Sequence, residues 1–264
     1  MGSAVEIRAW RPDVPGIAEV LHAYFPQHAY PRHTHDTWTL LIVDTGVVAF
    51  ELEHHEHGAL RTLVTLLPPH VPHDGRSVDA RGFRKRVIYL EADQVDESLV
   101  GRAVDHPGFG DPVLRDRVAA LHESLRHTGD EMEAETRLAL LRERLEAHLR
   151  QDVRGAVAAR DAGLARRLRD LLYARMAEGI GLSEAAALLG AHPTHLVRAF
   201  GHEYGIAPHQ YLIGRRLDRA RRLLLNGRRP ADAATEVGFF DQAHLNRHFK
   251  RLLGITPAAY ARSA

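Results

Sequence analysis

Two stretches near the C-terminal end of the chain repeat each other. The series Phe-x4-Gly-Ile-x-Pro-x2-Tyr runs from Phe200 to Tyr211 and again from Phe249 to Tyr260, and every matching pair is 49 positions apart. The apolar positions in both stretches have helical spacing. A repeat of this length therefore predicts two copies of one helical unit, and this strongly constrains the fold of the C-terminal part.

Each copy has the pattern of a helix-turn-helix. In the first copy a short helix is expected to end at Gly190, because glycine adopts the left-handed conformation of the turn at low cost. Pro193 suits the first turn of the next helix, where its missing N–H is not needed. In the second copy Gly238 has the same place, and the turn is one residue longer, up to a candidate N-cap at Asp241.

The second helix of each copy exposes side chains of the kinds that read base pairs. A major groove is about 12 Å wide and accepts one α-helix, in which Arg can bridge guanine, and Asn or Gln adenine. The residues expected to face DNA are Thr194, His195, Val197 and Arg198 in the first copy and Gln242, Asn246 and Arg247 in the second. A solvated polar face would explain either helix alone, but two matched units favour double-stranded DNA as the partner, with contacts in successive major grooves about 34 Å apart.

Charge is distributed unevenly along the sequence. From Gly163 to the C-terminus there are 16 Lys plus Arg against 8 Asp plus Glu, whereas the whole chain has a net charge of only +1, so the remainder is acidic. This asymmetry favours contact between the C-terminal part and a polyanion.

Composition excludes several classes of protein. The chain has no cysteine, so disulfides, thiol nucleophiles and Cys-type zinc sites are excluded. No apolar run approaches the roughly 18 residues that a membrane span needs. The first ten residues lack the pattern of a signal peptide, and we therefore expect a cytoplasmic protein without membrane contact.

The N-terminal part predicts strands. Four segments are rich in β-branched and other apolar residues and are separated by turn residues such as Gly46 and Pro68-Pro69; they are residues 37–43, 47–53, 59–67 and 83–90. The histidine-rich stretch from His54 to Gly58 is interpreted as the turn of a hairpin. Short, closely spaced strands indicate a sandwich or barrel.

Two helices are predicted between the strands and the repeat. Apolar stripes at Leu114, Val118, Leu121 and Leu125 and at Leu138, Leu141, Leu145 and Leu149 have helical spacing. These helices either pack on their own domain or also form a homodimer.

The predicted organisation is an α+β chain in which a β-barrel and a helical hairpin are followed by an all-α domain. Its parts are a first domain of residues 1–110, a helical dimerisation or connection segment 111–151, a linker 152–163 and a DNA-binding domain 164–264.

The C-terminal domain resembles the AraC/XylS family of transcription regulators. The resemblance covers Leu182–Tyr260 and is most specific in the series Ala234-x3-Gly238-Phe239-x-Asp241-x3-Leu245-x-Arg247-x-Phe249-Lys250-x3-Gly254-Ile255-Thr256-Pro257-x2-Tyr260. Two positions depart from the family pattern: His192 replaces the usual serine, and Leu245 replaces a common aromatic residue. The resemblance implies RNA polymerase as a partner and DNA contacts by Thr194, Val197, Arg198, Gln242, Asn246 and Arg247.

The N-terminal domain is similar to the cupin-like sensor domain that many of these regulators carry. His33-x-His35, Gly46 and Pro68-x2-Val71-x-His73 follow the two cupin motifs. In metal-binding cupins three histidines and one glutamate hold the ion. Here Thr39 has the place of the glutamate, and His70 that of a usual glycine.

The histidines leave the nature of the ligand open. His33, His35 and His73 could hold a transition metal such as zinc, because imidazole nitrogens suit these ions. Alternatively, an organic effector binds among these histidines, Trp38, Phe50 and Tyr89, or the domain has no ligand. A second histidine group, His54, His55 and His57, is explained by an exposed turn, with a surface metal site as the alternative.

Three functions are compatible with these patterns. A sequence-specific transcription regulator, controlled by a small molecule or a metal, explains both domains. A cupin enzyme fused to a DNA-binding domain is the first alternative, but no nucleophile motif or phosphate loop is present, and we expect no enzyme activity. The other alternative is a regulator or architectural protein that binds DNA without a ligand.

Overall fold

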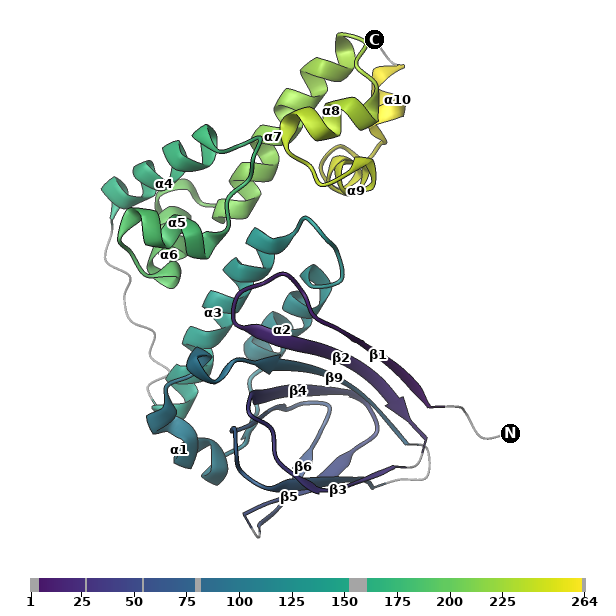
Figure 1. The fold of residues 1–264 in the computed structure, drawn as a ribbon, viewed down its shortest axis with the longest axis vertical. Helices are drawn as coiled ribbons and strands as arrows, with labels where there is room; N and C mark the ends of the chain where they lie inside the picture. The colour runs from purple at the N-terminus through teal and green to yellow at the C-terminus, as the bar shows by residue number, and fades with distance from the viewer. Residues whose placement is uncertain (1–4, 27, 54, 79–81, 152–160, 263–264) are drawn as a thin grey trace. The chain divides into compact units, whose positions relative to one another are not determined.

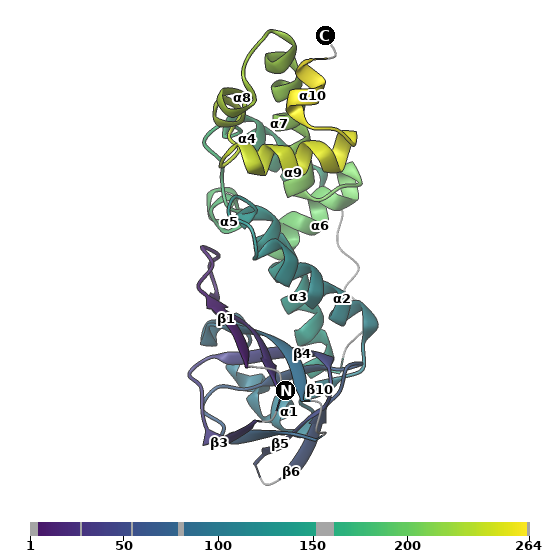
Figure 2. The same ribbon diagram turned by 90° about the vertical axis from the view of Figure 1, so that its right-hand side faces the viewer.

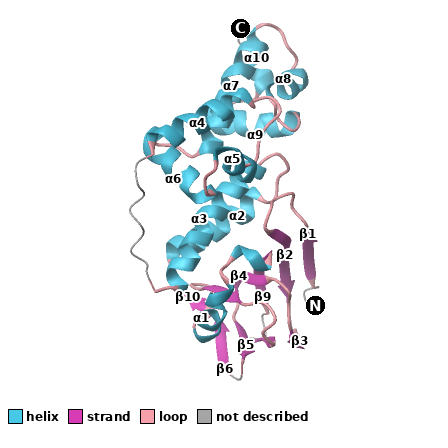
Figure 3. Ribbon diagram, turned by 60° about the vertical axis from the view of Figure 1, so that its left-hand side comes forward, coloured by secondary structure: helices cyan, strands magenta, loops and turns pink. Residues whose placement is uncertain are grey.

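The computed structural model describes residues 5–262 except 27, 54, 79–81 and 152–160. Contacts divide the chain into two compact units. The first, called the sensor unit below, comprises residues 1–123 and 141–155; the second, the DNA-binding unit, comprises residues 124–140 and 156–264. All strands of the described residues lie in the sensor unit, and helices α4–α10 lie in the DNA-binding unit (Figures 1 and 3).

The sensor unit is built on two antiparallel sheets. The larger has the order β1 (Glu6–Trp10), β2 (Ile17–Phe25), β9 (Phe83–Leu90), β4 (Trp38–Thr45), β7 (Val64–Leu67) and β10 (Gly108–Phe109). The smaller has the order β3 (Ala29–His33), β8 (His73–Ser77), β5 (Val48–Leu52) and β6 (His55–Ala59). Alternate residues of both sheets form one apolar cluster, to which Val43, Phe50 and Val87 belong. The expected cupin-like barrel is confirmed in this arrangement.

The histidine-rich stretch forms a strand, and its interpretation as a turn was wrong. Strand β6 pairs along its whole length with β5, from Leu52 opposite His55 to Val48 opposite Ala59. The left-handed residue of the connection is Glu53, with φ 44°. β6 lies at the edge of its sheet, where one side is open and polar side chains are tolerated. His54 lies outside the described residues.

Short helices complete the sensor unit. They are the 3-10 helices Ala92–Gln94 and Glu97–Leu99, α1 (Val100–Asp105) and α2 (Pro112–Ser124), together with the C-terminal part of α3 (Glu131–Leu149). Helix α2 lies against the larger sheet, where Arg115 donates to the Val43 carbonyl at 3.1 Å. Asp111 caps α2 by accepting from the Leu114 amide at 3.2 Å and also accepts from Arg144 of α3. The segment predicted as one connection, 111–151, is thus shared between the units, because residues 124–140 pack in the DNA-binding unit.

The DNA-binding unit contains two matched sets of helices. Its helices are α4 (Ala162–Ala174), α5 (Leu182–Leu189), α6 (Pro193–Tyr204), α7 (Pro208–Leu225), α8 (Pro230–Val237), α9 (Gln242–Leu253) and α10 (Pro257–Ala261). Phe200 and Phe249, which match in the repeat, are both fully buried, each in its own apolar cluster. Helices α9 and α10 lie beside α7 (Figure 2). The prediction of two helix-turn-helix units is confirmed: they are α5–α6 and α8–α9.

No helix among the described residues is long and apolar enough to cross a membrane.

Candidate functional site

The turn of the first helix-turn-helix is made by local interactions. Helix α5 ends at Gly190, which has the left-handed φ of 62°. His192 then caps α6, because its Nδ1 accepts from the amide of Thr194 at 3.3 Å. Histidine at the family's serine position therefore keeps the capping function.

The residues of α6 that were predicted to face DNA are less exposed than expected. Thr194, His195 and Arg198 are half-buried. Val197 is buried, in an apolar cluster that also contains Met132 and Ala139. Val197 is therefore not accessible in this structure, because residues far earlier in the chain pack in the same cluster as this helix.

The second helix-turn-helix presents a polar face. Helix α8 ends at Gly238, with φ 91°, and Asp241 caps α9 by accepting from the amide of His244 at 2.6 Å. Gln242 is exposed, and Asn246 and Arg247 are half-buried. Leu245 and Phe249 of the same helix are fully buried.

The carboxylate of Asp130 lies close to three side chains of α9. Arg247 Nη2 donates to Asp130 Oδ2 at 2.8 Å, and Oδ1 lies 2.9 Å from His248 Nε2 and 3.1 Å from His244 Nε2. Burial would raise the pKa of this carboxyl, but the contacts with His244, His248 and Arg247 outweigh burial and hold it well below its usual range. The only signal in the sequence is that the helical spacing is interrupted just before the second predicted helix. Sequence reasoning therefore missed the role of Asp130.

The group Asp130, His244 and His248 has the donor types of a metal site, but its hydrogen bonds do not fit one. The amide of Phe240 donates to Nδ1 of His244 at 3.2 Å, so the proton of a neutral ring lies on Nε2, which is 3.1 Å from Asp130 Oδ1 but makes no hydrogen bond among the described residues. The Arg247 guanidinium also occupies the other carboxylate oxygen. These contacts describe a carboxylate surrounded by donors.

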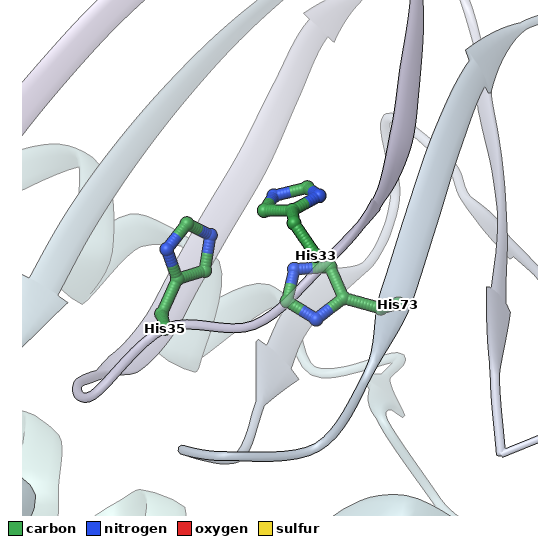
Figure 4. A group of neighbouring side chains, drawn as sticks. All are labelled: His33, His35 and His73. Carbon is green, nitrogen blue, oxygen red and sulfur yellow. The ribbon is translucent and has the colours of Figure 1, made fainter.

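The structure brings the three predicted histidines of the sensor unit together. His33 ends β3, His35 lies in the loop that follows, and His73 begins β8 (Figure 4). The ring centroids are 4.7–5.2 Å apart, and one nitrogen from each ring lies within 4.8 Å of the others. Burial, followed by the neighbouring His73 and His33, lowers the pKa of His35 to about 4, so this ring is neutral near pH 7.

Two of these rings have the orientation that a metal ligand needs. Nδ1 of His33 lies 2.7 Å from the Pro31 carbonyl oxygen, and Nδ1 of His73 lies 3.0 Å from that of Val71. Because a carbonyl oxygen only accepts, Nδ1 carries the proton and Nε2 keeps its lone pair. Thr39, at the family's glutamate position, has a buried hydroxyl without a hydrogen-bond partner among the described residues. The triad therefore fits a transition metal bound by three nitrogens, without a carboxylate.

The other predicted ligand-binding residues do not all lie in the interior between the two sheets. Tyr89 contacts His35, with ring centroids 5.2 Å apart, and Phe50 lies in the cluster between the sheets. Trp38 does not join them: it is fully buried, its indole N–H donates to the Ala92 carbonyl at 3.2 Å, and it is out of phase with Leu41 and Val43, which face the interior. We therefore assign Trp38 to the outer face of the sheet as a core residue.

Lys85 is an interior residue that sequence reasoning missed. It lies on β9 between Phe83 and Val87 in the alternation that faces the other sheet, and its Nζ is 4.4 Å from the centroid of the Tyr30 ring. Burial lowers its pKa to about 8. The alternation of Phe83, Lys85, Val87 and Tyr89 was visible in the sequence and was the available signal.

Comparisons with known proteins agree with both units. An AraC-like ligand binding domain model matches residues 16–142, and a helix-turn-helix domain model matches residues 185–263. An uncharacterized HTH-type transcriptional regulator, YbfI of Bacillus subtilis (strain 168), is 27% identical over 223 residues, which are 82% of this chain and 81% of that protein. The virulence regulon transcriptional activator VirF of Yersinia enterocolitica is 34% identical over 93 residues, 35% of this chain and 34% of VirF. Among solved structures, the AraC-like transcriptional activator CuxR is 17% identical, with a TM-score of 0.47, over 82% of this chain and 80% of that chain.

Proposed function

The chain belongs to the AraC/XylS family of transcription regulators, and from this premise we propose that its two helix-turn-helix units read one operator under the control of a small molecule in the sensor unit. RNA polymerase and a second copy of the chain are its further proposed partners, and the cytoplasm is its proposed place of action. The sensor unit has a binding role and no catalytic one in this proposal.

The observation that carries the proposal is the polar face of α9 over a buried apolar one. Gln242, Asn246 and Arg247 lie on a helix that the fully buried Leu245 and Phe249 anchor in the apolar cluster of this unit. Arg can bridge guanine O6 and N7, and Asn or Gln can bridge adenine N6 and N7. A rigid helix with these side chains reads a short series of bases in the major groove.

A footprint combined with a substitution tests this proposal. The full chain is expected to protect a defined site of about 20 base pairs, because two helices enter successive turns of the duplex. Arg247→Ala is expected to weaken specific binding about 10- to 100-fold, which corresponds to the ~1–3 kcal/mol of one bidentate base contact. Arg229→Ala is the matched control, because Arg229 is 83% exposed and lies at the start of α8. Unchanged specific binding by Arg247→Ala would refute the base-reading role.

Two kinds of ligand are candidates for the sensor unit. The first candidate is an organic effector among the histidine triad, Phe50 and Tyr89. The second is a transition metal such as zinc at His33, His35 and His73, and the specific observation in its favour is the pair of Nδ1–carbonyl contacts at His33 and His73. The two are compatible, since an ion held by three nitrogens keeps an open position for a ligand.

A further inference from the structure

We propose that the effector of the sensor unit is a small organic acid whose anionic group pairs with Lys85. This inference rests on the proposed control by a small molecule and names the chemical class of that molecule. It is carried by the position of one ammonium group inside the barrel.

Lys85 differs from the two arginines beside it on β9. Arg84 and Arg86 point to the outer face and have carboxylate partners: Arg84 pairs with Glu6 at 3.0 Å and Arg86 with Asp44 at 2.7 Å. Lys85 shares the inward-facing alternation of Phe83 and Val87, and its Nζ lies 4.4 Å from the centroid of the Tyr30 ring. Lys85 is half-buried, and an ammonium that is partly removed from water favours an anion beside it.

The surroundings of Lys85 fit an organic acid. Lys85 acts on both His35 and His73, as Asp36 does on His35 and Asp74 on His73, so it lies near the histidine triad, whose own members include no carboxylate. Tyr30 and Tyr89 supply ring faces and hydroxyls nearby. With a pKa of about 8, Lys85 is mostly protonated at neutral pH and is able to donate to a carboxylate.

The test compares what three versions of the full, untagged chain retain on purification. Small molecules are extracted from the wild type, from Lys85→Met and from Arg84→Met and identified by mass spectrometry. Arg84→Met is the matched control, because it removes a cation from the outer face of the same strand. An acid retained by the wild type and by Arg84→Met, but at least tenfold depleted in Lys85→Met, is the expected result.

A second measurement tests Lys85 without any ligand. Each protein is unfolded, freed of small molecules and refolded, and its melting temperature is measured. If Lys85 is an uncompensated cation, Lys85→Met melts at the same temperature as the wild type or higher. A lower melting temperature would make Lys85 a stabilising structural residue and overturn the proposal. Retention of a neutral molecule, or equal retention of an acid by Lys85→Met, would also overturn it while leaving control by an effector intact.

A different set of contacts carries a second inference: we infer that residues 124–140, called the clamp segment here, hold both recognition helices in a form that cannot bind DNA. The clamp segment belongs to the DNA-binding unit by its contacts, although it precedes the rest of that unit in sequence. Its partners are the residues and helix ends that DNA would use.

The clamp segment holds the second recognition helix through Asp130. The carboxylate accepts from Arg247 at 2.8 Å and contacts His248 at 2.9 Å. Asp130 is 7% exposed, so this interaction is shielded from water. Arg247 cannot bridge a guanine while its guanidinium is held by this carboxylate.

The first helix-turn-helix is covered by the same segment. Thr194 Oγ1 donates to the Ala139 carbonyl at 3.4 Å, and Val197 is buried in a cluster with Met132 and Ala139. Both residues are on the face of α6 that the family resemblance directs to DNA.

Glu135 occupies a place that suits a phosphate. Its Oε2 accepts from the amide of Ser183 at 2.7 Å and from the Ser183 hydroxyl at 2.5 Å, at the start of α5. Free amides at a helix N-terminus attract anions, and proteins use them to bind DNA phosphates. The clamp segment therefore places carboxylates where the DNA backbone and base edges would otherwise be bound.

The test is operator affinity measured on the full chain by fluorescence anisotropy. Asp130→Asn keeps the shape of the side chain but removes the charge that holds Arg247, and we expect about tenfold tighter binding, the scale of one charge-assisted hydrogen bond. Glu135→Gln, which loosens the other end of the clamp segment, is expected to tighten binding to a smaller extent. Asp170→Asn is the matched control for charge, because Asp170 lies exposed on α4 of the same unit.

Two results would overturn the inference that the clamp segment prevents DNA binding. One is operator binding by Asp130→Asn that is no tighter than that of Asp170→Asn. The other is tightening by Asp130→Asn on unrelated DNA to the same degree as on the operator, since release of Arg247 should favour the sequence it reads. Circular dichroism melting curves establish that each variant is folded, and Glu135→Gln provides the test independently if Asp130→Asn is not.

Discussion

Gly238 approaches the backbone of Ala177 so closely that no side chain fits between them. A β-carbon on Gly238 would lie 2.4 Å from the Ala177 carbonyl oxygen, and the residue also has a φ of 91°. Gly190, its counterpart in the first helix-turn-helix, has a φ of 62° and nothing within 4 Å of the same position. The two matched turns therefore need glycine for different reasons, one for conformation alone and the other for conformation and space.

This difference predicts that the same substitution, glycine to alanine, lowers the free energy of unfolding by different amounts at Gly190 and Gly238. Gly190→Ala is expected to lower the free energy of unfolding by about 1 kcal/mol, the cost of a left-handed backbone. Gly238→Ala should lower it by about 3 kcal/mol, because overpacking against a backbone carbonyl is added to that cost. Urea unfolding of both variants gives the comparison. Equal losses would mean that the turn after α8 moves away from Ala177 easily.

The repeat made the helix-turn-helix units predictable because the signals are local. Gly190, Gly238 and Asp241 define turns and caps within a few residues of where they stand. Apolar spacing then fixes which side of each helix is buried, as Phe200 and Phe249 confirm. None of these features depends on a distant part of the chain.

The differences at the two recognition helices arise from long-range packing. The burial of Val197 depends on a cluster that includes Met132 and Ala139, and the pairing of Arg247 depends on Asp130. Spacing within one helix cannot reveal a second segment on its polar side. The polar residues 55–59 differ in another way, because they form a strand through local pairing with the preceding strand β5.

Trp38 provides a prediction that separates a core role from a ligand-binding role. The side chain is fully buried, and its indole N–H donates to the Ala92 carbonyl at 3.2 Å. Trp38→Ala is expected to lower the free energy of unfolding by about 3–5 kcal/mol through the cavity it leaves. Trp38→Phe should cost less and should retain the same small molecules as the wild type. Loss of those molecules from a folded Trp38→Phe variant would show that Trp38 belongs to the ligand site.

The histidine triad gives a metal prediction that elemental analysis can check. If the triad holds an ion, the untagged chain should contain about one transition metal per chain, because three imidazole nitrogens form one site. His73→Ala should remove most of this metal, since it deletes one of the two rings with a free Nε2. His55→Ala is the matched control, because His55 is exposed on β6 and outside the triad. Metal that persists in His73→Ala would place the ion elsewhere.

Acid should destabilise the sensor unit through His35. Burial and the neighbouring His73 and His33 lower its pKa from 6.5 to about 4 in the folded chain. As the pH falls from about 6.5 to about 4, the unfolded chain takes up a proton that the folded chain does not, so the free energy of unfolding decreases across this window. Melting curves at pH 7 and pH 4.5, with a chelator present, should show a smaller loss of melting temperature for His35→Gln than for the wild type. His106→Gln, at an exposed position after α1, controls for removal of a histidine. The idea fails if both variants lose as much stability in acid as the wild type, because the acid sensitivity would then come from other buried histidines such as His122, whose pKa is also lowered by burial.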